Sequence, residues 1–254
     1  MEFLERDDGV RIAYQVHNPC SDGVPILLCH GFSATSTMWD ANVAALSADR
    51  PVVVWDHRGH GRSGAPTDPA AYSERISADD IAALLDRVAA RRAVIGGMSL
   101  GGYLSLAFHF HHPRRVAALV LVDTGPGYKS DVSRERWNGV VERYARRIET
   151  EGFTPGGTPE LANAVHDDPR GLALTARQVM AQRDDRIIRS LDGIAVPTLV
   201  VVGERDTNYL AGADYMARHI PRVRKVVLPG AGHASNIDQA TAFNSIVAEF
   251  LKSL

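Results

Sequence analysis

Short, nearly continuous apolar runs recur along the chain, and amphipathic segments separate them. Such runs are typical of parallel strands whose two faces are both covered by helices. The alternation therefore predicts an α/β fold with a mostly parallel central sheet flanked by helices. The six clearest runs are "PILLC", "PVVVW", "RAVIGG", "VAALVLVD", "VPTLVVVG" and "VRKVVLP", which begin at positions 25, 51, 92, 116, 196 and 223.

The first residues depart from this pattern. Ile12, Tyr14 and Val16 are spaced two residues apart, which is the period of a strand with one buried face. The pair Asp8-Gly9 precedes them, and such a pair favours the tight turn between antiparallel strands. We therefore expect the chain to open with an antiparallel hairpin at the sheet edge.

Helical periodicity predicts helices between the strands. One helix is expected to start at Ser77, because "SADD" places a carboxylate three residues after a serine that can cap it. A second helix begins at Ser99. The last covers residues 239–251, where apolar residues recur on one helical face.

The interval after the fourth of these runs breaks the alternation, because it contains helix-like segments and no good strand. In "SRERWNGVVERYARRI" apolar residues recur at helical spacing. Thr158-Pro159 and Asp168-Pro169 are signals for the first turns of two further helices. We interpret this interval as an inserted helical cap, which divides the chain into a core of residues 1–125 and 192–254 and a cap of residues 126–191.

Composition narrows the class of protein. Of 254 residues, 45% are hydrophobic and 23% are charged, as in ordinary globular proteins, and the formal net charge of -2 offers no basic surface for nucleic acid. No segment reaches the apolar length of a membrane span, and the acidic start "MEFLERDDGV" does not fit a signal peptide. We therefore expect a cytoplasmic protein that binds neither nucleic acid nor membrane. Cys20 and Cys29 match no disulfide framework or metal spacing.

Ser99 stands in "GMSLG", which matches the pattern G-x-S-x-G. The match lies where the apolar run "AVIGG" meets the helix-like segment "SLGGYLSLAF", and this is the strand, turn and helix arrangement of a nucleophile elbow. The turn strains the backbone of the serine, and a side chain at either flanking glycine would collide with the neighbouring strand or helix. Ser99 is therefore the candidate nucleophile.

A serine hydroxyl becomes a strong nucleophile when a base takes its proton and a third group orients that base. His233 follows one late predicted strand, and Asp206 follows the strand before it. Both fall at carboxyl ends of strands, the edge where parallel sheets bind ligands. Asp123 also ends a strand and is the alternative acid. We favour Asp206, because the turn-forming "GERD" leaves its side chain free and its strand immediately precedes the one that carries His233.

Acyl transfer also needs hydrogen-bond donors for the oxyanion. The candidate donors are the backbone N–H groups of Leu100, next to the serine, and of Phe32, in the "HGF" segment after an early strand. Met98, Trp137 and Tyr144 are candidate wall residues of an apolar substrate pocket.

Taken together, these segments resemble the α/β-hydrolase fold superfamily, in its serine-nucleophile branch, over nearly the whole chain. The resemblance implies a triad of Ser99, Asp206 and His233, an oxyanion hole at Phe32 and Leu100, and neither a metal nor an organic cofactor. It is carried by "HGF" at 30–32, "DHRGHGRSG" at 56–64, "GGMSLGG" at 96–102, "GERD" at 203–206 and "GAGH" at 230–233.

Two branches of that superfamily are similar to this chain. "GHASNIDQ" resembles the corresponding segment of enol-lactonases, and "HGF" with a small cap resembles cofactor-free haloperoxidases, which are similar to esterases. Dehalogenases and epoxide hydrolases carry aspartate in the elbow instead of serine. Gly97 and Ala234 stand where carbon–carbon bond hydrolases typically have asparagine and tryptophan.

The sequence thus predicts a serine hydrolase that cleaves small carboxylic esters or lactones through an acyl-enzyme. Two alternatives stay open. One is a ligand receptor or interaction protein that keeps the fold with little turnover. The other is a lyase or carbon–carbon bond hydrolase that uses the same triad without an acyl-enzyme.

Overall fold

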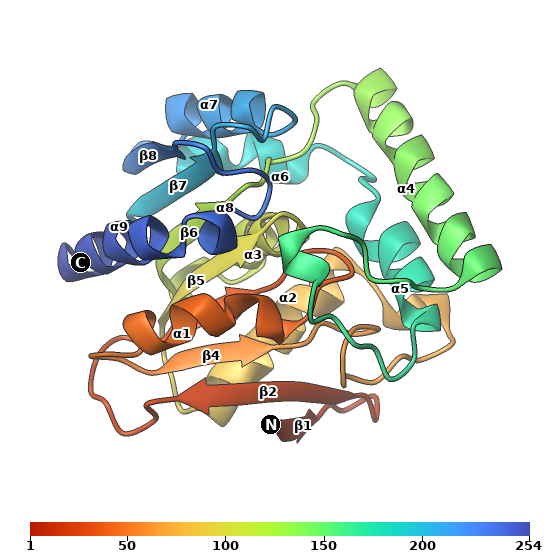
Figure 1. Cartoon of the computed structure of the whole chain (residues 1–254), viewed down its shortest axis with the longest axis horizontal. Coiled ribbons are helices and arrows are strands. Elements are labelled where there is room, and N and C mark those ends of the chain that lie inside the picture. Colours follow the sequence, from red (N-terminus) through yellow and green to blue (C-terminus); the bar gives the residue numbers. More distant parts are fainter.

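The computed structural model describes residues 1–254 and contains one sheet of eight strands in the order β1-β2-β4-β3-β5-β6-β7-β8 (Figure 1). All pairs among β3 to β8 are parallel. Each of the six apolar runs forms one of these strands, which confirms the predicted α/β class. The strands are β1 (Glu2–Glu5), β2 (Arg11–His17), β3 (Ile26–Cys29), β4 (Val52–Trp55), β5 (Ala93–Met98), β6 (Val116–Val122), β7 (Thr198–Gly203) and β8 (Val223–Leu228).

The predicted hairpin is also confirmed. Strands β1 and β2 pair antiparallel, with Glu5 opposite Arg11, and β2 continues antiparallel against β4. Gly9 has a φ of 78°, which a glycine adopts in such a turn without steric cost. The N-terminus therefore lies at one edge of the sheet (Figure 1).

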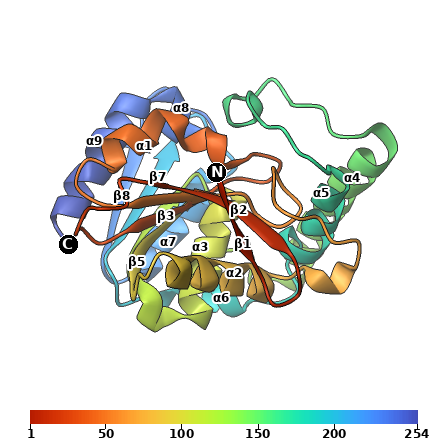
Figure 2. The same cartoon turned by 90° about the horizontal axis from the view of Figure 1, so that it is seen from below.

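Helices cover both faces of the sheet. Helices α1, α8 and α9 lie on one face, and α2, α3 and α6 lie on the other (Figure 2). Leu27 belongs to the buried cluster on one face and Leu28 to the cluster on the opposite face, because successive residues of a strand point to opposite sides. This double burial explains why the runs of the inner strands are continuously apolar, whereas the edge strand β8 carries exposed Arg224 and Lys225. The helices are α1 (Asp40–Leu46), α2 (Glu74–Arg87), α3 (Leu100–His111), α4 (Asp131–Glu151), α5 (Arg170–Thr175), α6 (Arg186–Arg189), α7 (Leu210–His219), α8 (Ser235–Asp238) and α9 (Ala240–Lys252).

The predicted start of helix α2 at Ser77 is wrong by one turn. The helix is capped by Ser73, whose hydroxyl accepts a hydrogen bond from the Ile76 N–H at 3.0 Å. Ser77 lies inside the helix, and its hydroxyl donates to the Ser73 carbonyl at 3.0 Å. The first of the two serines caps the helix because the residues between them continue it without a breaker.

Between β6 and β7 the chain forms helices and no strand. Helix α4 packs on α5, and both lie beyond the sheet edge where the parallel strands end (Figure 1). Asp168-Pro169 precedes α5, whereas Thr158-Pro159 precedes only a short 3-10 turn, Pro159–Leu161. Helix α6 packs its buried Ile187 and Ile188 into the apolar cluster on the sheet face that α2 and α3 cover. The division into a core and a cap of residues 126–191 stays a prediction. None of the helices combines the length and hydropathy that a membrane span requires.

Candidate active site

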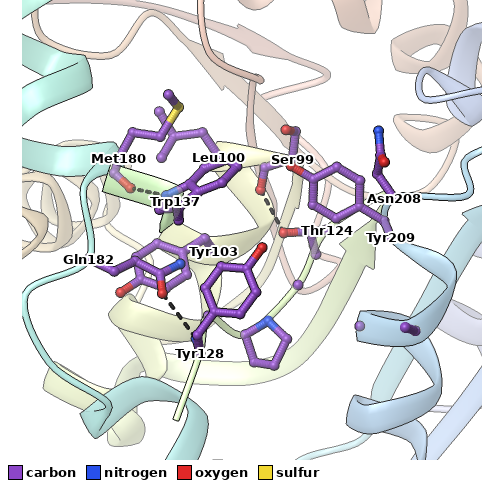
Figure 3. Close-up of a pocket in the computed structure, with 15 residues that line it drawn as sticks. Ser99, Leu100, Tyr103, Thr124, Tyr128, Trp137, Met180, Gln182, Asn208 and Tyr209 are labelled. Atoms are coloured by element: carbon purple, nitrogen blue, oxygen red, sulfur yellow. Dashed lines mark hydrogen bonds between the residues drawn. The ribbon is translucent and has the colours of Figure 1, made fainter. Parts of the chain in front are cut away.

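Ser99 occupies a strained turn between β5 and α3. Its φ of 53° and ψ of −117° lie outside the regions that residues with a side chain favour. Two hydrogen bonds hold it there: its N–H donates to the Val122 carbonyl at 2.9 Å, and the Thr124 hydroxyl donates to its carbonyl at 2.6 Å (Figure 3). Because the surrounding backbone fixes this turn, the serine side chain is held at the sheet edge.

The glycines beside Ser99 are required by close backbone approach. A Cβ on Gly97 would lie 2.3 Å from the carbonyl carbon of Gly101, and a Cβ on Gly101 would lie 2.3 Å from the carbonyl oxygen of Cys29. Such distances are far below van der Waals contact. The expectation that a side chain at either position would collide with its surroundings is therefore confirmed.

His233 and Asp206 meet above the ends of β7 and β8. The distance from His233 Nδ1 to Asp206 Oδ2 is 2.8 Å, and the Asp206 side chain is buried. An ionised carboxylate can only accept, so Nδ1 donates and Nε2 is the nitrogen left to act as a base. Burial lowers the pKa of His233, but the Asp206 carboxylate outweighs it, and the pKa is raised above its usual 6.5.

Asp123, the alternative acid, is placed differently. Its two carboxylate oxygens accept hydrogen bonds from the backbone N–H groups of Gly203, at 2.7 Å, and Ser235, at 2.9 Å. Burial raises its pKa to about 7, although these hydrogen bonds oppose the shift. Asp123 thus ties the end of β7 to the loop that carries His233, while Asp206 contacts the imidazole itself.

One cavity of about 810 Å³ brings the expected residues together. Ser99, Asp206 and His233 line it, and so do Phe32, Met98, Trp137 and Tyr144. Leu100 lines a smaller neighbouring cavity of about 170 Å³, which also reaches Ser99 (Figure 3). Ser99 therefore lines both cavities.

The loop that carries Phe32 leaves one backbone donor free. The Gly31 carbonyl accepts from His30 Nδ1 at 2.7 Å, and the Ser33 N–H donates to His60 Nε2 at 3.2 Å. The Phe32 N–H between them has no acceptor in the protein. Leu100 is the first residue of α3, where backbone N–H groups have no partner within the helix.

Tyr209 was missed by the sequence reasoning. Its ring stacks on the His233 imidazole with centroids 4.8 Å apart and an angle of 20°, and it lines both cavities. Burial raises the pKa of its phenol to about 12, although contact with the Ser99 hydroxyl lowers it, so the phenol is neutral at physiological pH. Its position in the loop three residues after Asp206 is the sequence signal that could have drawn attention to it.

Both apolar and polar residues line the small cavity of about 170 Å³. The Trp137 indole N–H donates to the Met180 carbonyl at 2.9 Å, and Gln182 Oε1 accepts from the Tyr128 N–H at 3.0 Å (Figure 3). The side chain of Asn208 also lines this cavity. No group of three or more histidine, cysteine, aspartate or glutamate side chains is arranged to hold a metal ion.

The chain is similar to several known proteins over most of its length. A protein from Bacillus subtilis (strain 168), described as a candidate 2-succinyl-6-hydroxy-2,4-cyclohexadiene-1-carboxylate synthase, is 28% identical over 97% of both chains. The 3-oxoadipate enol-lactonase 2 of Acinetobacter baylyi is 27% identical, over 91% of this chain and 90% of its own. The structure of a thermophilic esterase from Thermogutta terrifontis matches with a TM-score of 0.83 at 29% identity, over 100% of this chain and 99% of the esterase chain.

The family model agrees with these matches and spans most of the chain. Residues 26–246 match the model described as the alpha/beta hydrolase family. The relatives support an enzyme of the hydrolase class. The chain belongs to the alpha/beta hydrolase family.

Proposed function

We propose that the protein is a serine hydrolase of small carboxylic esters or lactones, with Ser99 as nucleophile, His233 as general base and Asp206 as the group that orients the base. The observation that carries the proposal is the 2.8 Å contact between Asp206 and His233 in the cavity that also contains the strained elbow serine. This combination is the set of groups that acyl transfer requires.

In the proposed reaction, the Ser99 hydroxyl attacks the ester or lactone carbonyl while His233 Nε2 takes its proton. The tetrahedral intermediate collapses as the imidazolium gives this proton to the leaving alcohol oxygen, which produces an acyl-enzyme. Water then attacks the acyl carbon with His233 as base, and the acid departs as Ser99 regains its proton. Asp206 favours the imidazolium that forms in each half of the reaction.

The oxyanion would be stabilised by two backbone donors. The Phe32 N–H is without an acceptor, and the Leu100 N–H lies at the start of α3, where the helix dipole is positive. Fixed donors of this kind lower the barrier of acyl transfer by about 3–4 kcal/mol per donor in related chemistry.

A second candidate is a lyase or synthase that uses the triad as a base without an acyl-enzyme. The similarity to the Bacillus subtilis protein described as a candidate synthase favours it. A ligand receptor has no such observation in its favour.

The proposal is tested by fluorophosphonate labelling of the wild type and of Ser99→Ala, beside hydrolysis of p-nitrophenyl acetate, butyrate and octanoate. We expect labelling and turnover in the wild type and neither in the variant. Labelling without turnover would indicate a receptor or a narrowly specific enzyme. An unlabelled wild type would remove Ser99 as an activated nucleophile.

A further inference from the structure

Glu160 lines the cavity of about 810 Å³ and has no role in the proposed triad chemistry. It lies in the 3-10 turn Pro159–Leu161, which packs against α8 and against the 3-10 turn Ser36–Trp39. Helix α8 directly follows the loop of His233. Glu160 lines the same cavity as Ser99 and His233, and its negative charge contributes to the raised pKa of His233.

No positively charged side chain around this cavity pairs with Glu160. Its side chain forms no ion pair, and its Oε2 atom is buried without a hydrogen-bond donor. The other charged residues of the cavity wall are paired: Asp206 contacts His233, and Arg147 Nε donates to Glu151 at 3.0 Å. The wall therefore presents one unpaired negative charge and no unpaired positive charge.

Such an arrangement selects among ligands by charge. A carboxylate whose Oε2 is buried without a donor is poorly solvated, and a positively charged ligand group in the cavity would stabilise its negative charge. A carboxylate on the ligand would instead meet Glu160 with like charge and find no free cation to balance it. The cavity wall is thus matched to a cationic group within a substrate of otherwise apolar character.

We propose that Glu160 is a specificity-determining residue that receives an ammonium group of the substrate, so that the enzyme prefers cationic esters to uncharged esters of the same shape. The inference rests on the proposed ester chemistry. It also separates this chain from the Bacillus subtilis relative, whose described product is a carboxylate.

The test compares esters that differ only in charge. Butyrylcholine is paired with 3,3-dimethylbutyl butyrate, its uncharged isostere, to place the charge on the alcohol side. The p-nitrophenyl esters of trimethylammonio-hexanoic acid and of the isosteric dimethyloctanoic acid place it on the acyl side. In at least one pair, we expect kcat/KM of the wild type to favour the cation by about tenfold, as for a charge pair partly screened by solvent.

Two variants identify the source of the preference. Glu160→Gln keeps the shape of the side chain and should bring that ratio close to one. Glu135→Gln removes the same unit of charge from an exposed position of α4 outside the cavity, and it should keep the wild-type ratio. Circular dichroism and thermal melting confirm that both variants are folded.

The outcomes separate this inference from the proposed function. Hydrolysis of both members of each pair with equal kcat/KM, or a ratio that Glu160→Gln leaves unchanged, would overturn the role of Glu160 and leave the serine hydrolase intact. If no ester is cleaved and Ser99 is not labelled, the proposed function fails. Calorimetric titration of Ser99→Ala with butyrylcholine and its isostere then decides on Glu160: tighter binding of the cation supports the inference, and equal binding overturns it.

Discussion

Replacement of Asp206 by asparagine should abolish most of the catalysis while leaving the protein folded. The carboxylate is buried and lies 2.8 Å from His233 Nδ1, so the substitution removes the negative charge that offsets the burial of the imidazole. Removing one partner of a buried pair costs about 3–5 kcal/mol. If that cost falls on the imidazolium of the transition state, kcat drops by about 10²–10⁴, at 1.36 kcal/mol per tenfold change.

The matched control is Asp123→Asn, which changes the other buried carboxylate near His233. An asparagine oxygen can replace only one acceptor for the N–H groups of Gly203 and Ser235, so we expect a loss of stability of about 1–3 kcal/mol. Its effect on kcat should be much smaller than that of Asp206→Asn. Stopped-flow hydrolysis of p-nitrophenyl butyrate and urea unfolding measure both quantities. A larger loss of kcat in Asp123→Asn than in Asp206→Asn would refute the assignment of the acid.

A change of pH and two substitutions near Ser99 test the same site. Only the neutral imidazole is a base, and the pKa of His233 is raised, so the rate of ester hydrolysis should rise with pH through an apparent pKa above 6.5. A flat rate profile between about pH 5 and 8 would contradict the role of His233 as base. Tyr209→Phe keeps the stacked ring but loses the phenol beside Ser99, so kcat should fall by up to about tenfold in steady-state assays, and an unchanged kcat would show that only the ring matters. Gly97→Ala places a Cβ 2.3 Å from the Gly101 carbonyl and should lower stability by at least about 1–3 kcal/mol in thermal melts, an outcome that a wild-type melting temperature would exclude.

The strands of the sheet were predictable from the sequence because the burial of both strand faces is visible as a local run of apolar residues. A strand covered on both faces needs apolar residues at consecutive positions, and Leu27 and Leu28 meet opposite clusters. The start of α2 was not predictable in the same way. Ser73 and Ser77 are both able to cap a helix, and the carboxylate three residues after Ser77 favours the serine that does not cap it.

The candidate residues in the segments that directly follow strands were predictable from the sequence. The positions of Ser99, Asp206 and His233 in the chain place all three at one sheet edge, and the structure places them around one cavity. Tyr209 and Glu160 reach that cavity from segments between the strands, whose conformations depend on packing between parts of the chain far apart in the sequence. No local pattern specifies such packing.

The proposed reaction passes through an acyl-enzyme on Ser99. Rapid mixing of the protein with p-nitrophenyl butyrate, followed by acid quenching and mass spectrometry of the digested chain, tests it directly. We expect a butyryl group on the peptide that contains Ser99, formed in the wild type and absent in Ser99→Ala. Continued turnover without this adduct, or an adduct on another residue, would contradict it.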